Sequence, residues 1–386
     1  MNFDPTWILI GLPIAFALGW LASRFDLRQW RLENRQAPKA YFKGLSYLLN
    51  EQQDQAIDAF IEAVQRDPDT SELHFALGNL FRRRGEYERA VRVHEHLLSR
   101  ADLSAVDRER AQHALALDFL KAGLLDRAED ALQKLQDTRY AQEAALTLLS
   151  IHERARDWPE AGEIARRLQA GGQGDFSGRL AHYLCEQAAA EQTRQKNPDR
   201  ARQLLEQAIT DAPSAARPRI QLAGLCAAQG DAAGAFAALM QLPERAPQFM
   251  PLVASELVRL GTACGQLPQA LTALETSSAQ TPSVDVTDAI VQALAAQGQP
   301  PGQARQRYVR HMAQEPSLIA TGRWLAHERF TSEADHPTVQ RSIDHAVRPL
   351  ARYRCAACGF EAQGYFWQCP GCLTWESFPP RRVEEL

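Results

Sequence analysis

The sequence predicts an all-α protein built mainly from a solenoid of helical hairpins, with a transmembrane helix before it and a small cysteine-rich domain after it. Small, aromatic and helix-ending residues recur about every 34 positions, an uncharged apolar segment lies near the amino terminus, and two Cys-x-x-Cys pairs lie near the carboxyl terminus. We therefore expect four parts: an anchor at 1–23, a basic linker at 24–38, about eight to nine repeats at 39–350 and a cysteine-rich domain at 351–386.

The amino-terminal segment has the composition of a membrane span. No charged residue lies between Asp4 and Arg24, and residues 7–22 are almost entirely apolar. About 17 to 19 helical residues extend roughly 26 to 28 Å, which is the short end of what a bilayer core requires. A cleaved signal peptide is the main alternative, but the segment lacks a preceding basic stretch and a clear cleavage motif. We favour an anchor.

The charges beside the apolar segment predict its orientation. Six basic residues against two acidic ones follow it, and no basic residue precedes it. They are Arg24, Arg28, Arg31, Arg35, Lys39 and Lys43, with Asp26 and Glu33 between them. Because positive flanks stay in the cytoplasm, we expect a single-pass inner-membrane protein with its repeats and carboxyl-terminal domain on the cytoplasmic side. Contact of this basic stretch with anionic lipid headgroups is a second reading of the same charges.

The repeat is clearest between Ala40 and Leu98. Two antiparallel helices would place small residues where the helix axes cross, and the pattern returns 34 residues later. The first unit contains Gly44, Tyr47, Ala56, Phe60, Ala63 and Pro68, and the second contains Gly78, Phe81, Gly85 and Ala90. Gly85 would take a left-handed conformation between the two helices. This pattern resembles the tetratricopeptide repeat, and an irregular alanine-rich helical protein is the alternative.

Further units follow with looser matches. Residues 112–140 form a third unit after a short insertion in 101–106, and a fourth centres on Ala161 after Trp158-Pro159. A fifth spans 180–213, and the later units end at Pro247, Pro282 and Pro316, which are 35 and 34 residues apart. Helices containing Trp324 and covering 336–350 would cap the array. Gly171, Gly172 and Gly174 form a loop or a hinge.

Charge and motifs exclude several functions. The net charge is -4 and the pI is about 6.2, so nothing attracts the chain to nucleic acid, and we expect no nucleic-acid partner. The phosphate-binding, serine-elbow and His-Glu-x-x-His motifs are absent from the sequence, and we expect no enzymatic activity. His94, Glu95 and His96 cannot form the last motif, and we expect them to be solvated. Cys185, Cys226 and Cys264 lie on apolar helix faces and should be buried.

The two cysteine pairs predict a metal site. Cys355 and Cys358 form the first pair, and Cys369 and Cys372 form the second after ten intervening residues. Each pair brings two thiolates to one metal, and four thiolates in tetrahedral geometry select zinc or iron. Two disulfides are the alternative, although the usage of cysteine suits a reducing compartment. Phe360, Tyr365, Phe366, Trp367, Trp375 and Phe378 would supply the core that so short a domain otherwise lacks.

The sequence around these cysteines resembles rubredoxin, whose metal is iron held by four cysteines. Cys-Pro-Gly-Cys at 369–372 and Cys-Gly-Phe at 358–360 carry the resemblance. Two departures put an electron-transfer role in doubt: Leu373 replaces the glycine usual after the fourth cysteine, and the segment is about half the length of a free rubredoxin.

The order of the three parts resembles the lipopolysaccharide assembly protein B family of Gram-negative bacteria. The resemblance covers the whole chain and implies an inner-membrane adaptor that promotes turnover of the committed-step deacetylase of lipopolysaccharide synthesis, a UDP-acyl-N-acetylglucosamine deacetylase, by the membrane protease FtsH. It implies these two proteins and other lipopolysaccharide-assembly proteins as partners. A homo-oligomer is a further possibility. Only the four cysteine ligands can be transferred residue by residue.

Two functions of other classes remain open. One is an electron carrier, which would require reversible reduction of the metal at a useful potential. The other is a general peptide-binding co-chaperone, which would show a basic set of Lys, Arg and Asn on the inner helices of consecutive repeats. That set is not evident in the sequence.

Overall fold

The computed structural model describes residues 42–67, 69–326, 328 and 334–386, together with Phe16 and Trp20. The expected anchor and basic linker thus lie outside the described residues apart from those two positions. None of the helices in the described part of the chain combines the length and the apolar character needed to cross a membrane.

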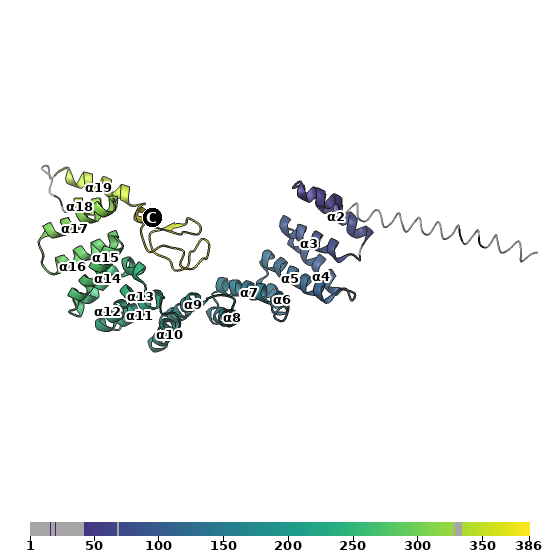
Figure 1. The fold of residues 1–386 in the computed structure, drawn as a ribbon, viewed down its shortest axis with the longest axis horizontal. Helices are drawn as coiled ribbons and strands as arrows, with labels where there is room; N and C mark the ends of the chain where they lie inside the picture. Colours follow the sequence, from purple (N-terminus) through teal and green to yellow (C-terminus); the bar gives the residue numbers. More distant parts are fainter. Residues whose placement is uncertain (1–15, 17–19, 21–41, 68, 327, 329–333) are drawn as a thin grey trace, which may run out of the picture. The chain divides into compact units, whose positions relative to one another are not determined.

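The chain divides into two compact units, Met1–Ala155 and Arg156–Leu386, and each is described by itself. In the first unit a helix at residues 42–49 precedes six longer helices (Figure 1). These are α2 (Gln53–Arg66), α3 (Ser71–Arg84), α4 (Tyr87–Ser99), α5 (Ala105–Ala122), α6 (Leu125–Gln133) and α7 (Ala141–Ala155). Consecutive helices pack as hairpins, and α3 also contacts α5, so that each hairpin rests on the next.

The second unit continues the hairpins and ends in a small β-hairpin (Figure 1). Its helices are α8 (Trp158–Ala170), α9 (Ser177–Ala190), α10 (Pro198–Asp211), α11 (Arg217–Ala228), α12 (Ala232–Leu239), α13 (Leu242–Arg245), α14 (Met250–Ala263), α15 (Leu267–Gln280), α16 (Val284–Ala296), α17 (Pro301–Gln314), α18 (Leu318–Leu325) and α19 (His336–Val347). Short helical turns are η1 (Glu191–Gln195, a π-helix), η2 (Pro247–Phe249) and η3 (Val383–Glu385). The strands β1 (Tyr353–Arg354) and β2 (Glu361–Ala362) pair antiparallel, with Tyr353 opposite Ala362.

The small residues of the repeat lie where two helices cross closely, as the sequence predicts. A Cβ atom on Gly44 would come within 2.8 Å of the Phe60 ring, and Ala56 is fully buried. Gly85 ends α3 with a φ of 85°, and the next N–H, that of Glu86, donates to the Phe81 carbonyl. This left-handed turn reverses the chain between the two helices of the hairpin.

His94 is buried, so the expectation that it is solvated is wrong, whereas Glu95 and His96 are exposed. The reason is its position four residues after Ala90, on the buried face of α4. Its Nδ1 lies 2.5 Å from a carboxylate oxygen of Asp118 on α5, and the other oxygen of Asp118 accepts from Arg82 at 2.8 Å. A polar network thereby joins α3, α4 and α5.

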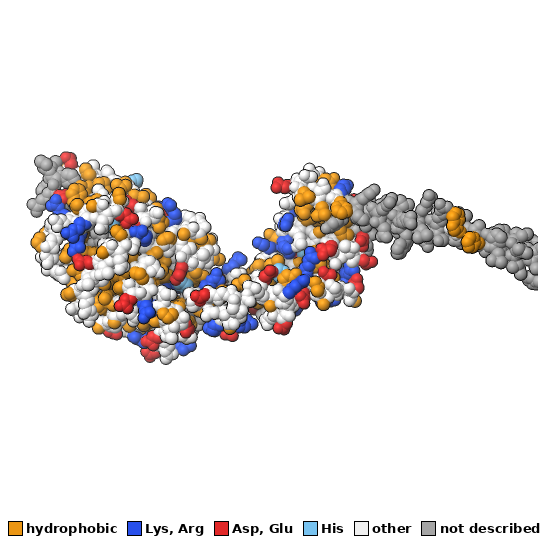
Figure 2. Space-filling view, in the orientation of Figure 1, with side chains coloured by type: hydrophobic (Ala, Val, Ile, Leu, Met, Phe, Trp, Pro, Cys, Tyr) orange, Lys and Arg blue, Asp and Glu red, His pale blue; other side chains and the backbone are white. Residues whose placement is uncertain are grey.

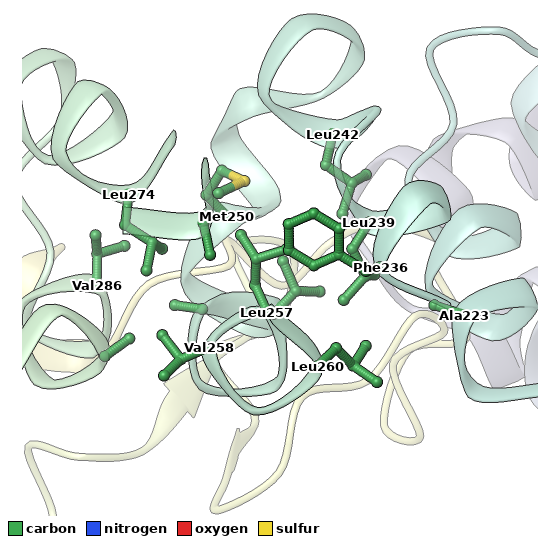
Figure 3. Packing of buried hydrophobic residues seen from close by; sticks show 14 of the residues in the cluster. Ala223, Phe236, Leu239, Leu242, Met250, Leu257, Val258, Leu260, Leu274 and Val286 are labelled. Atoms are coloured by element: carbon green, nitrogen blue, oxygen red, sulfur yellow. The ribbon is translucent and has the colours of Figure 1, made fainter. Parts of the chain in front are cut away.

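A continuous apolar core runs through the middle of the second unit. Phe236 and Leu239 of α12 meet Leu257 and Leu260 of α14, and Met250 packs beside them (Figure 3). All five side chains are almost completely inaccessible to solvent. The cluster continues to Val286 of α16, so successive hairpins share one core rather than closing separate ones.

Two further sequence expectations concern this unit. Cys185 and Cys226 are buried, as expected of small apolar residues, whereas Cys264 is only half-buried. Gly171–Gly174 forms a loop between α8 and α9, in which Gly172 has a φ of 71°.

Charges of both signs are mixed on the face of the molecule that Figure 2 shows. On the face shown in Figure 2, Lys and Arg side chains alternate with Asp and Glu side chains in both units. No broad basic patch appears on that face of the described residues, which agrees with the net charge of -4.

The contact between Gly78 and His94 generates a stability prediction. A Cβ on Gly78 would lie 2.5 Å from the His94 ring, so Gly78→Ala should lower the free energy of unfolding by about 1 to 3 kcal/mol. Urea unfolding followed by circular dichroism, with hydrogen exchange of α3 and α4, measures the effect.

The matched control is Gly224→Ala. Gly224 is exposed in the middle of α11 with no atom within 4 Å of an added Cβ, so this change should stabilise by about 0.5 to 1 kcal/mol. Unchanged stability of Gly78→Ala would contradict the close packing of His94 on the α3 backbone.

Candidate metal centre

Four cysteine sulfurs converge at the carboxyl-terminal hairpin. The Sγ atoms of Cys355 and Cys372 are 3.8 Å apart, those of Cys358 and Cys369 are 3.7 Å apart, and all four lie within 4.8 Å of one another. A tetrahedral site with metal–sulfur bonds of about 2.3 Å places its sulfurs about 3.8 Å apart. The predicted ligand set is therefore gathered at a spacing that suits one zinc or iron ion.

The two pairs fold into similar turns. The N–H of Gly359 donates to the Cys355 carbonyl at 2.9 Å, and the N–H of Leu373 donates to the Cys369 carbonyl at 2.8 Å. Both turns end in a left-handed residue, with φ values of 78° at Gly359 and 60° at Leu373. The departure at Leu373 thus falls where a left-handed conformation is required, and a leucine there is strained by roughly 1 to 2 kcal/mol.

The four thiols differ in environment. Cys355 and Cys369 are buried, Cys372 is half-buried and Cys358 is exposed. Desolvation opposes ionisation of Cys355, but the Ser377 hydroxyl and the Cys358 N–H outweigh it and lower the Cys355 pKa to about 6. The side chain and N–H of Thr374 also lower the pKa of Cys372.

Cys358 behaves in the opposite way. The Phe360 N–H favours its thiolate, but desolvation and the hydrogen bonds shared with the other sulfurs raise its pKa to about 12. Four thiols this close share protons, and a bound cation would take the place of those protons. Zinc or iron, held by these four residues, would supply a structural crosslink there.

The aromatic residues of the domain fall into two groups. Phe378 is buried within the hairpin region and Tyr365 meets it edge to face, as expected of a small core. Phe360 and Phe366, by contrast, are 41% and 40% exposed, so the expectation that all six aromatics form the domain core is wrong in part. Trp367 and Trp375 instead pack on the repeats.

Trp375 is the centre of one contact with the repeats. Its ring stacks on His182 of α9 with centroids 4.6 Å apart and 14° between the planes. Trp158 and Tyr183 meet it edge to face, at 5.9 and 6.1 Å. The neighbouring Glu376 lies 3.1 Å from His182 Nε2, which fixes the orientation of the imidazole.

A buried arginine lies beneath the two tryptophans. The Arg217 guanidinium lies 6.0 Å from the Trp367 ring centre and 5.8 Å from that of Trp375, within reach of a cation–π interaction. It pairs with Glu186 at 2.5 Å. Burial lowers the pKa of His182 despite the Glu376 hydrogen bond, because the charged imidazole would lose its hydration.

The last residues of the chain make a second contact with the repeats. Glu384 accepts hydrogen bonds from the N–H groups of Leu318 and Ile319 at the start of α18, and Glu385 accepts one from Val284 at the start of α16. Arg382 pairs with Asp285 at 2.7 Å. Each glutamate caps a helix whose first N–H groups have no partner within the helix.

Sequence reasoning identified the four clustered cysteines but none of these contacts. His182 and Arg217 lie on ordinary helices far from the cysteines in sequence, and no local motif marks them. The adjacent acids Glu384 and Glu385 offer the one usable signal, since paired carboxylates commonly lie at helix amino termini.

Comparisons with known proteins agree with these parts. Residues 43–94, 113–176 and 192–255 match tetratricopeptide repeat models, and residues 353–380 match a rubredoxin metal binding domain. These matches confirm the repeats and the rubredoxin-like domain predicted from the sequence.

Two relatives match nearly the whole chain. Lipopolysaccharide assembly protein B of Escherichia coli strain K12 is 32% identical over 96% of this chain and 97% of its own length. The protein of the same name from Haemophilus influenzae is 26% identical over 97% of this chain and 98% of its own.

The site generates a metal-binding prediction. The full-length protein should bind one metal ion, and Cys369→Ser should abolish most of this binding because the buried thiolate is lost. Elemental analysis of purified protein measures it, and a red or violet colour would indicate iron whereas a colourless metalloprotein would indicate zinc. Cys264→Ser, at a half-buried cysteine outside the site, is the control. Full metal content in Cys369→Ser would eliminate the four-cysteine site.

A second prediction concerns the strained leucine. Leu373→Gly should stabilise the metal-bound domain by roughly 1 to 2 kcal/mol, because glycine adopts the left-handed conformation freely and the leucine side chain is already 45% exposed. Slower loss of metal to a chelator would reveal this added stability. Gly359→Ala, the converse change in the other turn, should accelerate that loss. A less stable Leu373→Gly variant would mean that the leucine contacts outweigh the strain.

Proposed function

Because the chain belongs to the lipopolysaccharide assembly protein B family, we propose that it is a non-enzymatic, membrane-anchored adaptor in lipopolysaccharide assembly. The family resemblance recognised in the sequence is thereby confirmed. The observation that carries the proposal is the similarity over nearly the whole chain, which includes both the repeats and the metal domain.

The architecture is compatible with an adaptor. Stacked helical hairpins present long surfaces that bind protein segments, and their stability depends only on neighbouring repeats. The metal domain packs on this array through Trp375 and Trp367 and not through a flexible tether alone. A domain fixed in this way can shape a binding surface.

The finer proposal is that the adaptor brings the committed-step deacetylase to the membrane protease FtsH. The apolar segment near the amino terminus would hold the repeats at the inner membrane on its cytoplasmic side. Confinement of tethered partners raises their effective concentration to roughly millimolar, which increases occupancy by ~10² or more without new contacts.

An electron carrier is the alternative that one observation favours, since Cys358 is exposed. The aromatic and ionic contacts of the metal domain with the repeats support a structural role instead. Reversible reduction of the bound metal at a useful potential would favour the electron carrier.

The test is the half-life of the deacetylase in cells that carry only a form starting at Arg24, at matched expression. We expect this form to remain helical, the enzyme to persist and lipopolysaccharide to accumulate, because the partners no longer meet at the membrane.

A form with an unrelated single span of the same orientation is the matched control and should restore turnover. A half-life equal to that with the full-length protein would show that proximity is dispensable. Aggregation of the truncated form would show that the amino-terminal segment is part of the fold.

A further inference from the structure

We propose that the surface around His182 and Arg217 is a peptide-binding socket for an aromatic residue followed by a carboxylate, and that the metal domain occupies and gates it. The socket consists of Trp158, His182, Tyr183, Glu186 and Arg217, from α8, α9 and α11. In this structure it holds Trp375 and Glu376 of the same chain. The inference goes beyond the proposed function, because it does not depend on which protein the adaptor serves.

The socket recognises an aromatic ring from three sides. His182 lies parallel to the indole of Trp375, whereas Trp158 and Tyr183 meet it with planes inclined at 68° and 69°. Trp158 and Tyr183 also stack on each other at 5.7 Å, so the two walls support one another. Offset and edge-to-face contacts of this kind favour a flat aromatic side chain over an aliphatic one.

The socket also selects charge. Neutral His182 can donate from Nε2 to the Glu376 carboxylate while its Nδ1 faces Arg217 at 3.5 Å. Arg217 is only 6% exposed, and its guanidinium is paired on one side with Glu186. A carboxylate beside the ring therefore satisfies the imidazole and lies near a buried cation.

The second cysteine turn positions the residues that fill the socket. The Cys369 N–H donates to the Thr374 carbonyl at 3.0 Å, and the Glu376 N–H donates to the Trp367 carbonyl at 2.8 Å. Gln368 and Trp375 form an isolated antiparallel bridge. This hairpin contains Cys369 and Cys372. An ion that joined these two thiolates to Cys355 and Cys358 would therefore also hold Trp375 in the position from which it enters the socket.

Metal occupancy would therefore control access. A docked, tethered segment competes at an effective concentration of roughly millimolar, so a free peptide is excluded while the metal domain is folded. Without the ion, a segment of this length lacks the core to stay folded. Its docking would then cost the conformational entropy of ordering the segment, which weakens its competition for the socket. The socket then becomes available to a segment of another protein with the same aromatic and acidic chemistry.

The experiment uses the full-length protein in detergent micelles and a fluorescein-labelled peptide with the sequence of residues 373–379. Anisotropy should show at least tenfold tighter binding to metal-stripped protein than to metal-loaded protein. Peptides with Ala for the tryptophan or Gln for the glutamate should bind at least tenfold more weakly. Equal affinity for the loaded and stripped forms would overturn the gate.

Two variants test the proposal even if metal removal unfolds the repeats. The metal-loaded double variant Trp375→Ala, Glu376→Gln vacates the socket with the ion retained, and it should bind the peptide about as tightly as the stripped protein. Absence of binding there would overturn the socket.

The second variant, His182→Ala, should abolish binding in the stripped protein. Its control is His113→Ala, which removes a histidine stacked on Tyr140 in the other unit and should leave binding unchanged. Retained binding in His182→Ala would also contradict the proposal.

Discussion

A helical hairpin in this protein can bury its apolar face only against the hairpins beside it, and the rest of the structure depends on this constraint. Close stacking requires small residues at the crossings, which is why Gly44 faces Phe60 and Gly78 faces His94. In the second unit the core extends without a break from α11 to α16. The carboxyl-terminal residues pack on the last helices of the array, where Glu384 caps α18 and Glu385 caps α16.

The sequence was informative wherever the determinants are local and periodic. The return of small residues at 34-residue intervals predicted the hairpins, and the spacing of Cys355, Cys358, Cys369 and Cys372 predicted the ligand cluster. It was uninformative where the determinants are side chains distant in the chain. His94 was expected to be solvated because it is polar, and Asp118, the carboxylate that it contacts, lies 24 residues later on the next hairpin.

The docking of the metal domain on the repeats also depends on side chains that are distant in the sequence. Trp375 was expected to fill the core of its own domain, because a domain so short needs every apolar side chain it has. The structure solves the same problem differently, since the domain uses the repeats as part of its core and leaves Phe360 and Phe366 partly exposed. The surface that accepts Trp375 is formed by residues far away in the sequence. His182, for example, precedes Glu376 by 194 positions.

The helix caps supplied by the final glutamates also affect the order of events during synthesis. The Val284 N–H and its acceptor on Glu385 are 101 residues apart. At about 5 to 20 residues per second, a ribosome needs roughly 5 to 20 s to make the second after the first. For that interval the start of α16 has no protein acceptor from the tail. The start of α18 waits about two thirds as long, because Glu384 follows Leu318 by 66 residues. The nascent array thus passes through a stage with open helix ends, at which a chaperone or a premature partner could intervene.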